Sequence, residues 1–211
     1  MSKPSVYLSK NYAKAVDYAR KQHEHQARKG SGIPYLYHLL GVSSLVLEYG
    51  GDEDQAIAAL LHDVIEDCGE KHEKVIRKRF GDKVADIVLS CTDGSEESKA
   101  QAKTAEAKLA NWRERKLAYL KHLRVEKDFA LLVSCCDKLH NARAIVADLE
   151  NPKVGRAVFD RFTAKRDGTL RYYQSVSEVF TRRKLPPAAA LDSTVQRMHA
   201  LAGVRARKRL E

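Results

Sequence analysis

The sequence has few of the residues that build disulfide frameworks and cysteine-based metal sites. It contains four cysteines among 211 residues, at positions 68, 91, 135 and 136, and no two of them form a C-x-x-C pair. This spacing argues against a zinc site made of thiolates, and the adjacent Cys135 and Cys136 cannot bridge each other without strain. We therefore expect four small buried thiols in a reducing compartment.

Long apolar segments are also missing. No run reaches the roughly 18 apolar residues that a membrane-spanning helix needs. Residues 1–10 lack the apolar stretch of a secretory signal. Together these two absences predict a cytoplasmic protein that does not enter a membrane.

Negative charge is in short supply. The chain has 38 Lys and Arg residues against 28 Asp and Glu residues, which gives a formal net charge of +10. Such a surplus attracts nucleotides, polyphosphates, nucleic acid or acidic lipid, and charge alone does not choose among them. Because no recognised nucleic-acid-binding motif is present, we do not expect a nucleic-acid partner. The basic run at 205–209 is interpreted as a solvated chain end.

The sequence shows little alternation of period two and no internal repeat, which predicts an all-α fold in a single helical bundle. Helices are expected at about 8–26, 37–49, 53–68, 71–80, 83–90, 109–122, 127–148, 153–181 and 189–203. The polar stretch at 95–108 is expected to be an exposed, mobile loop that leads into a helix. We expect a domain at 1–181, followed by a C-terminal helical extension and basic tail at 182–211.

The strongest local signal is a set of polar residues inside an apolar helix. His62, Asp63, Glu66 and Asp67 interrupt the segment L-L-H-D-V-I-E-D at 60–67. Burying such groups without partners is costly, and a metal ion is the simplest compensation. On one continuous helix, residues 62 and 66 lie one turn apart, as do 63 and 67. Two residues are then placed to bind metal while two carboxylates face the second shell or a substrate.

A second polar set follows the apolar run at 129–133. Asp137 and Asn141 share a helix face at i and i+4, and His38 stands alone among aromatic and aliphatic residues at the start of the second helix. The predicted metal ligands are His38, His62, Asp63 and Asp137. A mixed imidazole and carboxylate site suits manganese, iron, cobalt or zinc better than calcium. Taken singly, His38 is also compatible with a hydrogen-bonded core residue, and Asp137 with a cap or an ion pair.

These residues resemble the H…HD…D pattern of the HD-domain metal phosphohydrolases. The resemblance is closer still to the hydrolase domain of the RelA/SpoT family and to its free-standing small alarmone hydrolases. It covers about residues 8–150, and more loosely extends to 181. The segments that carry it are A-R-K-G at 27–30, P-Y-L-Y-H at 34–38, A-A-L-L-H-D-V-I-E-D at 58–67, F-G at 80–81 and D-K-L-H-N-A-R at 137–143.

The resemblance implies an HD-domain helical bundle that removes the 3′-pyrophosphate of ppGpp and pppGpp, usually with one manganese ion. The partner would be a purine nucleotide with a 3′-diphosphate. The four predicted ligands would bind the metal, while Glu66 and Asp67 would orient or deprotonate the attacking water. Arg28 and Lys29 would flank the purine. Asn141 and Arg143 would line the nucleotide pocket.

The chain departs from the family pattern in places. Leu39 and Leu40 replace the proline that usually follows the first histidine, and the stretch 95–108 is hard to align, so phosphate-binding residues there stay unassigned. The run K-R-D-G-T-L-R-Y-Y at 165–173 is equally compatible with substrate contacts and with helix packing. The chain is too short to add the synthetase domain of the long family members, so we expect hydrolysis only.

Two alternatives remain open. The same metal site would fit an adenine substrate, either ppApp or the 2′-phosphate of NADPH, because stacking does not separate guanine from adenine. The second alternative is a non-enzymatic basic binding module, which leaves the polar residues at 62–67 without a buried partner. The sequence does not indicate the oligomeric state.

Overall fold

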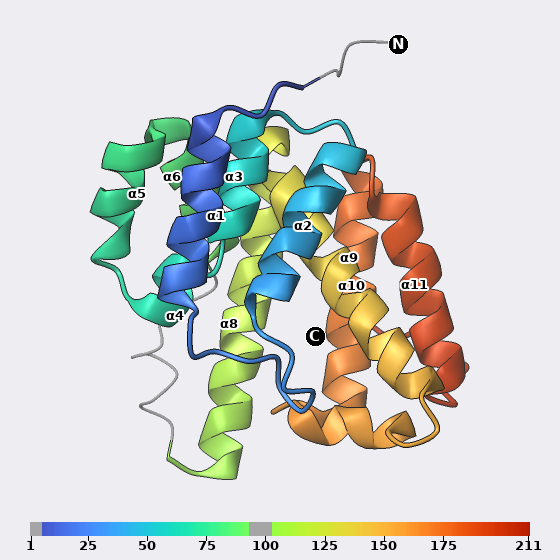
Figure 1. The fold of residues 1–211 in the computed structure, drawn as a ribbon. Coiled ribbons are helices and arrows are strands. Elements are labelled where there is room, and N and C mark those ends of the chain that lie inside the picture. The colour runs from blue at the N-terminus through green and yellow to red at the C-terminus, as the bar shows by residue number, and fades with distance from the viewer. Residues whose placement is uncertain (1–5, 93–102) are drawn as a thin grey trace.

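The computed structural model describes residues 6–92 and 103–211. These residues form helices and no β-strand, apart from an isolated β-bridge between Ala27 and Pro34. The elements are α1 (Lys10–Gln22), α2 (Leu36–Glu48), α3 (Glu53–Leu61), α4 (Val64–Cys68), α5 (His72–Phe80), α6 (Asp82–Cys91), α8 (Ala105–Val125), α9 (Asp128–Glu150), the 3-10 helix η1 (Gly155–Arg161), α10 (Lys165–Arg182) and α11 (Ala188–Leu201) (Figure 1). The predicted all-α class is confirmed. Within the described ranges, no helix has the length and apolarity to cross a membrane.

Several helices begin at residues whose side chains bind the free N–H groups of the first turn. Ser9 caps α1, Asp52 and Gln55 form a capping box at the start of α3, and Thr104 accepts from Ala107 N at α8. Gly81, with φ +96°, ends α5 and precedes α6, a backbone conformation that favours glycine. Part of the loop expected at 95–108 lies outside the described residues, but residues 105–108 already belong to α8.

The helix expected over 53–68 is broken at His62 and Asp63. The structure has α3 before these two residues and α4 after them, and Asp63 adopts φ −98° and ψ −4°. In an unbroken helix, neighbouring side chains diverge by about 100°. The break lets both side chains approach one point, with His62 Nε2 3.1 Å from Asp63 Oδ2. Both flanking segments are apolar, so the periodicity carries no sign of the interruption.

The prediction of a single helix over 153–181 is also wrong. Gly155 has φ +53° and Lys165 has φ +51°, and neither value continues an α-helix. The chain instead forms η1 and then starts α10 at Lys165. As a result, η1 packs against α9 and α10 and brings Arg161 to Asp148, with an NH1–Oδ2 distance of 2.6 Å.

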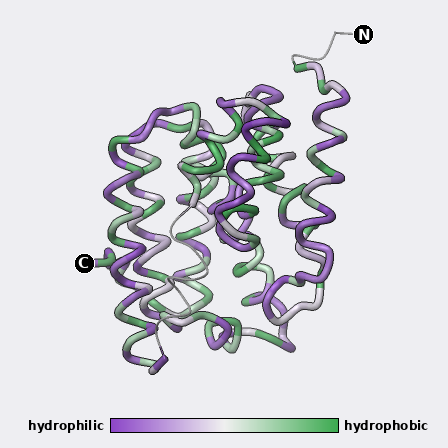
Figure 2. The backbone as a smooth tube through the Cα atoms, turned by 90° about the vertical axis from the view of Figure 1, so that its left-hand side faces the viewer, coloured by the Kyte–Doolittle hydropathy of each residue, from purple (hydrophilic) through white to green (hydrophobic). Residues whose placement is uncertain are grey.

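The core is organised around α9, which packs against α2, α3, α6 and α11. Hydrophilic and hydrophobic residues alternate along most of the helices, as expected when each helix buries one face (Figure 2). Helix α3 is the exception, since every residue from Gln55 to Leu61 is buried. This central position of α3 and α9 places the polar residues on them deep in the molecule.

The C-terminal extension packs on the same core. Leu191, Val195 and Met198 of α11 are fully buried, and α11 contacts α9 and α10. The basic run at 205–209 is largely exposed, in line with its interpretation as a solvated end, but two of its arginines form ion pairs with the core helices. Arg207 forms an ion pair with Asp192, and Arg209 Nε lies 2.6 Å from Glu178 Oε2.

Replacing Met198 with alanine should lower the free energy of unfolding by about 2–5 kcal/mol, because the truncation leaves a cavity in a close-packed interior. Chemical denaturation measures the effect, and Gln196→Ala, at an exposed position of the same helix, is the matched control. Equal unfolding energies for the two variants would mean that α11 is not part of the cooperative core.

Candidate active site

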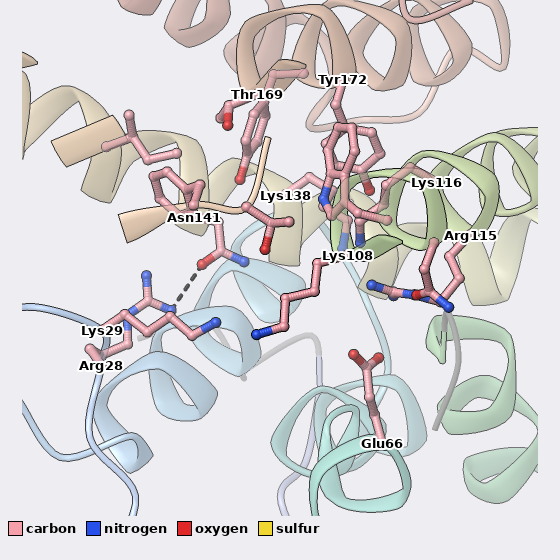
Figure 3. A pocket seen from close by; sticks show the side chains of 16 residues that line it. Arg28, Lys29, Glu66, Lys108, Arg115, Lys116, Lys138, Asn141, Thr169 and Tyr172 are labelled. Atoms are coloured by element: carbon pink, nitrogen blue, oxygen red, sulfur yellow. Dashed lines mark hydrogen bonds between the residues drawn. The ribbon is translucent and has the colours of Figure 1, made fainter. Parts of the chain in front are cut away.

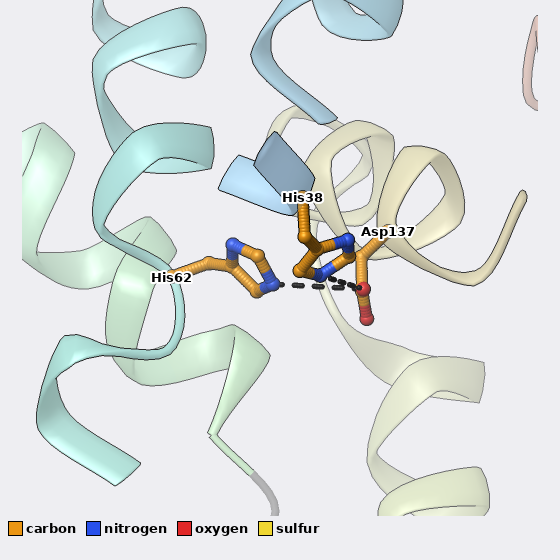
Figure 4. Close-up of side chains that lie close together, drawn as sticks. All are labelled: His38, His62 and Asp137. Atoms are coloured by element: carbon orange, nitrogen blue, oxygen red, sulfur yellow. Dashed lines mark ion pairs between the residues drawn. The ribbon is translucent and has the colours of Figure 1, made fainter. Parts of the chain in front are cut away.

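Three buried side chains from distant parts of the chain meet at one point. His38 comes from the first turn of α2, His62 from the junction of α3 and α4, and Asp137 from the middle of α9 (Figure 4). One ligand atom from each lies within 4.8 Å of the others. Asp137 Oδ1 is 3.2 Å from His38 Nε2 and 3.5 Å from His62 Nε2. The side chains are 1%, 2% and 8% exposed, so the cluster is shielded from water.

Asp63 reaches the same cluster. Its Oδ2 atom lies 3.1 Å from His62 Nε2 and 3.8 Å from His38 Nε2. The hydroxyl of Tyr35 donates a hydrogen bond of 2.5 Å to the same oxygen and fixes the carboxylate. The structure therefore brings together all four side chains that the sequence indicated as ligands.

The donor atoms fit a divalent metal ion. His62 donates from Nδ1 to the carbonyl of Ala59 at 2.8 Å, while its buried Nε2 has no hydrogen-bond partner among the described residues. This is the arrangement of a histidine ligand that is oriented by its other nitrogen. Two imidazole nitrogens and two carboxylates form a donor set suited to a divalent transition metal.

The electrostatics of the cluster also favour a cation. Burial alone would raise the pKa of both carboxyls, but His62 beside Asp63 and Lys138 beside Asp137 hold the pKa of each carboxyl below its usual range. Although burial opposes it, the two carboxylates raise the pKa of His62. The site thus attracts positive charge at His62 Nε2, whether that charge is a proton or a metal ion.

The two acidic residues expected to act on water lie on α4, directly after the cluster. Asp67 Oδ2 accepts a hydrogen bond of 2.8 Å from Gln26 Nε2. Gln26 Oε1 accepts in turn from His23 Nδ1 at 2.5 Å, so this chain sets the orientation of the Asp67 carboxylate. Glu66 points into the adjoining space, where Lys108 also points (Figure 3).

A cavity of about 490 Å³ adjoins the cluster and is strongly basic. Its cationic lining residues are Arg28, Lys29, Lys108, Arg115, Lys116 and Lys138 (Figure 3). Its aromatic lining residues are Trp112, Phe162, Tyr172 and Tyr173. A neighbouring cavity of about 450 Å³ shares Arg28, Lys29, Glu66 and Asn141 with the first, and reaches Asp63 and Asp67. Together the two cavities extend from Asp63 and Asp67 to the cationic and aromatic side chains. This arrangement suits a nucleotide with several phosphates.

The comparison with protein-family models decides the family. The model described as "HD domain" matches residues 15–170, well over half of the chain. The chain belongs to the HD domain family. In this HD domain, the matched region contains the metal-site cluster and the helices that support it.

Relatives of the HD domain include named alarmone hydrolases. A guanosine-3′,5′-bis(diphosphate) 3′-pyrophosphohydrolase of Haemophilus influenzae is 38% identical over 129 residues, which is 60% of this chain and 17% of the relative. MESH1 of Xenopus tropicalis, with the same enzyme name, is 35% identical over 132 residues, or 61% of this chain and 66% of the relative. The chain thus spans about a fifth or less of the long curated relatives it matches, at 17% to 20% of their length.

A solved structure shares the fold of this HD domain. It is that of a metazoan orthologue of SpoT that hydrolyses ppGpp, and it aligns with a TM-score of 0.70 over 94% of this chain and 99% of that chain. The sequences are 24% identical over this alignment, so the likeness supports the arrangement of helices.

Asn141 and Arg143 lie at different sites in this HD domain, although the family resemblance implied that both line the nucleotide pocket. Asn141 accepts from Arg28 NH1 at 2.9 Å and donates to Asp137 Oδ1 at 2.6 Å, so it links the cavity to the cluster. Arg143 instead lines a groove between α9 and α11. Two residues along a helix are about 200° apart around its axis, so the two side chains leave opposite faces of α9.

The side chains of α8 that line the cavity were not predicted from the sequence as site residues. Lys108, Trp112, Arg115 and Lys116 follow the spacing i, i+4, i+7 and i+8, which is one face of a helix. That spacing was the available signal, but the helix was expected to start only at 109. In the run 165–173, Thr169, Tyr172 and Tyr173 line the cavity, and Tyr172 also packs edge-on against Trp112.

Lys138 connects the cluster to the basic cavity. Its Nζ atom lies 2.5 Å from Asp137 Oδ2 and 5.2 Å from the ring centroid of Tyr119. Burial opposes the charge, but the adjacent Asp137 raises the pKa of Lys138 well above its usual value. A permanent positive charge therefore holds one oxygen of Asp137 and leaves the other facing His38 and His62.

Proposed function

We propose that this chain is a metal-dependent pyrophosphohydrolase that removes the 3′-pyrophosphate of ppGpp and pppGpp, giving GDP or GTP and pyrophosphate. The observation that carries the proposal is a buried His and Asp cluster whose Asp137 is hydrogen-bonded to Lys138 and Asn141, two residues that line a cavity with six cationic side chains. The names of the similar relatives, including the short MESH1 protein, support the choice of substrate.

The proposed metal ligands are His38, His62, Asp63 and Asp137, and we propose Mn²⁺ as the ion because the donor set mixes imidazole and carboxylate. When bound, such an ion lowers the pKa of a water molecule and neutralises charge on the phosphoryl oxygens. The protein's own contribution is to hold the four donors together, with His62 oriented by the Ala59 carbonyl and Asp63 by the Tyr35 hydroxyl.

Glu66 and Asp67 are the proposed proton acceptors. The hydrogen bond from Gln26 to Oδ2 sets the orientation of the Asp67 carboxylate, to which we assign the roles of orienting the attacking water and taking its proton. Glu66, which lines both cavities, is placed to accept a proton at the same side of the substrate.

The basic and aromatic side chains are proposed to bind the nucleotide. Arg28 and Lys29 would flank the purine, and Asn141 would contact the sugar-phosphate near the cluster. Lys108, Arg115 and Lys116 would pair with phosphate oxygens, since cations bind phosphate through charge-assisted hydrogen bonds. Trp112 and Tyr172 offer apolar faces for stacking, which do not discriminate between purines.

We further propose a cytoplasmic setting for this reaction. None of the four cysteines forms a disulfide in the described residues, and three of them are buried. Unpaired thiols are typical of a reducing compartment.

Product analysis on the manganese-loaded protein tests the function, with ppGpp, ppApp and NADPH assayed in parallel. We expect pyrophosphate release from ppGpp, and no release after the metal has been removed by a chelator. Preference for ppApp, or phosphate release from NADPH, would keep the site chemistry and overturn the guanosine substrate. Absence of turnover of all three by metal-loaded protein would overturn the proposal.

A further inference from the structure

Either ring nitrogen of His38 can carry the proton of the neutral imidazole, and the other then carries the lone pair that binds a metal. Its Nε2 atom faces Asp137 and Asp63, at 3.2 Å and 3.8 Å, and is the atom that takes part in the cluster. A neutral imidazole carries its single proton on one nitrogen and a lone pair on the other. If Nε2 is to bind a metal, the proton has to reside on Nδ1, and a buried N–H requires an acceptor.

The group that faces Nδ1 of His38 in the structure is a second histidine. Nδ1 of His38 lies 3.0 Å from Nδ1 of His140, and the two ring centroids are 4.9 Å apart. His62 meets the same requirement through the backbone carbonyl of Ala59. Of the two proposed histidine ligands, His38 is therefore the one whose protonation pattern depends on a side chain.

The position of the His140 ring is enclosed by neighbours on α2. Tyr37 packs edge-on against it, with ring centroids 5.4 Å apart. A Cβ atom at position 41 would lie 2.2 Å from His140 Nε2, so the absence of a side chain at Gly41 makes room for the ring. Together these contacts hold the Nδ1 atom of His140 against His38.

We propose that His140 is a positioning residue that accepts the Nδ1 proton of His38 and thereby keeps the Nε2 lone pair of His38 free for the metal. The inference rests on the metal site in the proposed function, and it does not depend on which nucleotide is hydrolysed. His140 then carries its own proton on Nε2. The residue acts through His38 and does not itself contact the ion.

A pair of nearly isosteric substitutions separates this role from simple packing. His140→Asn keeps an acceptor oxygen on Cγ, where Nδ1 is attached in histidine, whereas His140→Leu has a similar shape and no acceptor. Manganese affinity, measured by isothermal titration calorimetry on the full chain, should fall about 10- to 100-fold in the leucine variant and stay within about threefold in the asparagine variant. Thermal unfolding of the metal-free proteins controls for lost packing.

A leucine variant that folds and binds manganese within about threefold of the wild type would overturn the inference. If the leucine variant does not fold, His140→Gln replaces it, because glutamine places its amide near the Nε2 position instead. Equal affinities of the asparagine and glutamine variants would also overturn the proposal. Wild-type protein that binds no divalent metal would instead refute the proposed metal site itself.

A direct measurement needs no variant. The ¹⁵N chemical shifts of the His38 ring in the wild-type protein report which nitrogen carries the proton. We expect the proton on Nδ1 in protein loaded with diamagnetic Zn²⁺, with the chemical shift of a hydrogen-bonded N–H. A His38 ring protonated on Nε2 would overturn the inference.

Discussion

Replacing His62 with alanine should remove the metal ion and the hydrolysis of ppGpp together. The imidazole supplies Nε2 at 3.1 Å from Asp63 Oδ2 and 3.5 Å from Asp137 Oδ1, so its loss leaves only His38 and the two carboxylates to hold the ion. Loss of the metal's contribution should lower the turnover rate by roughly a thousandfold, equivalent to about 4 kcal/mol. Elemental analysis of the purified variant measures the metal, and pyrophosphate release measures the reaction.

His25→Ala is the matched control for this experiment. His25 is exposed and lies outside the cluster, so its removal should leave metal content and turnover unchanged. A His62→Ala protein with full metal occupancy would remove His62 from the ligand set, even if activity were lost.

Changing Asp67 to asparagine should abolish turnover and spare the metal. The substitution keeps the shape of the side chain, and the amide oxygen can still accept from Gln26, as Asp67 Oδ2 does at 2.8 Å. The remaining amide nitrogen cannot accept a proton from water, so the rate should fall about 100- to 10,000-fold. Metal content near that of the wild type distinguishes this outcome from the result at His62.

Glu70→Gln provides the control for Asp67→Asn, because it removes an exposed carboxylate three residues along the chain. Its turnover should match that of the wild type. Retained turnover in Asp67→Asn would refute the role of Asp67 as a proton acceptor and would leave Glu66 to carry that role.

The parts of the site that could be predicted are those where polar residues interrupt apolar ones. His38, His62 and Asp137 are buried themselves and occur in largely apolar segments, and burial of such groups is costly without a partner. The structure places them, together with Asp63, at one point. Local sequence context points to these residues because their chemistry conflicts with their surroundings, and their joint occurrence, with the family resemblance, selects the ligand interpretation over a structural one.

The parts that could not be predicted depend on tertiary contacts. The break between α3 and α4 lies inside an apolar stretch, so its helical periodicity continues through His62 and Asp63 although the backbone does not. From its sequence alone, the basic face of α8 is typical of a solvated helix surface. Only the fold shows that other segments complete a cavity with it. The family resemblance implied that both Asn141 and Arg143 line the nucleotide pocket, but the two side chains leave α9 on opposite faces.

The hydrogen bonds from Arg28 to Asn141 and from Asn141 to Asp137 have a consequence for how the proposed site can evolve. If Arg28 contacts the purine and Asp137 the metal, as we propose, these bonds connect the two binding sites, and coupling between two binding sites is reciprocal. A substitution at Arg28 that alters the preferred nucleotide will also alter the restraint on the Asp137 carboxylate. We therefore expect substitutions that change the preferred nucleotide to change the preferred metal ion as well.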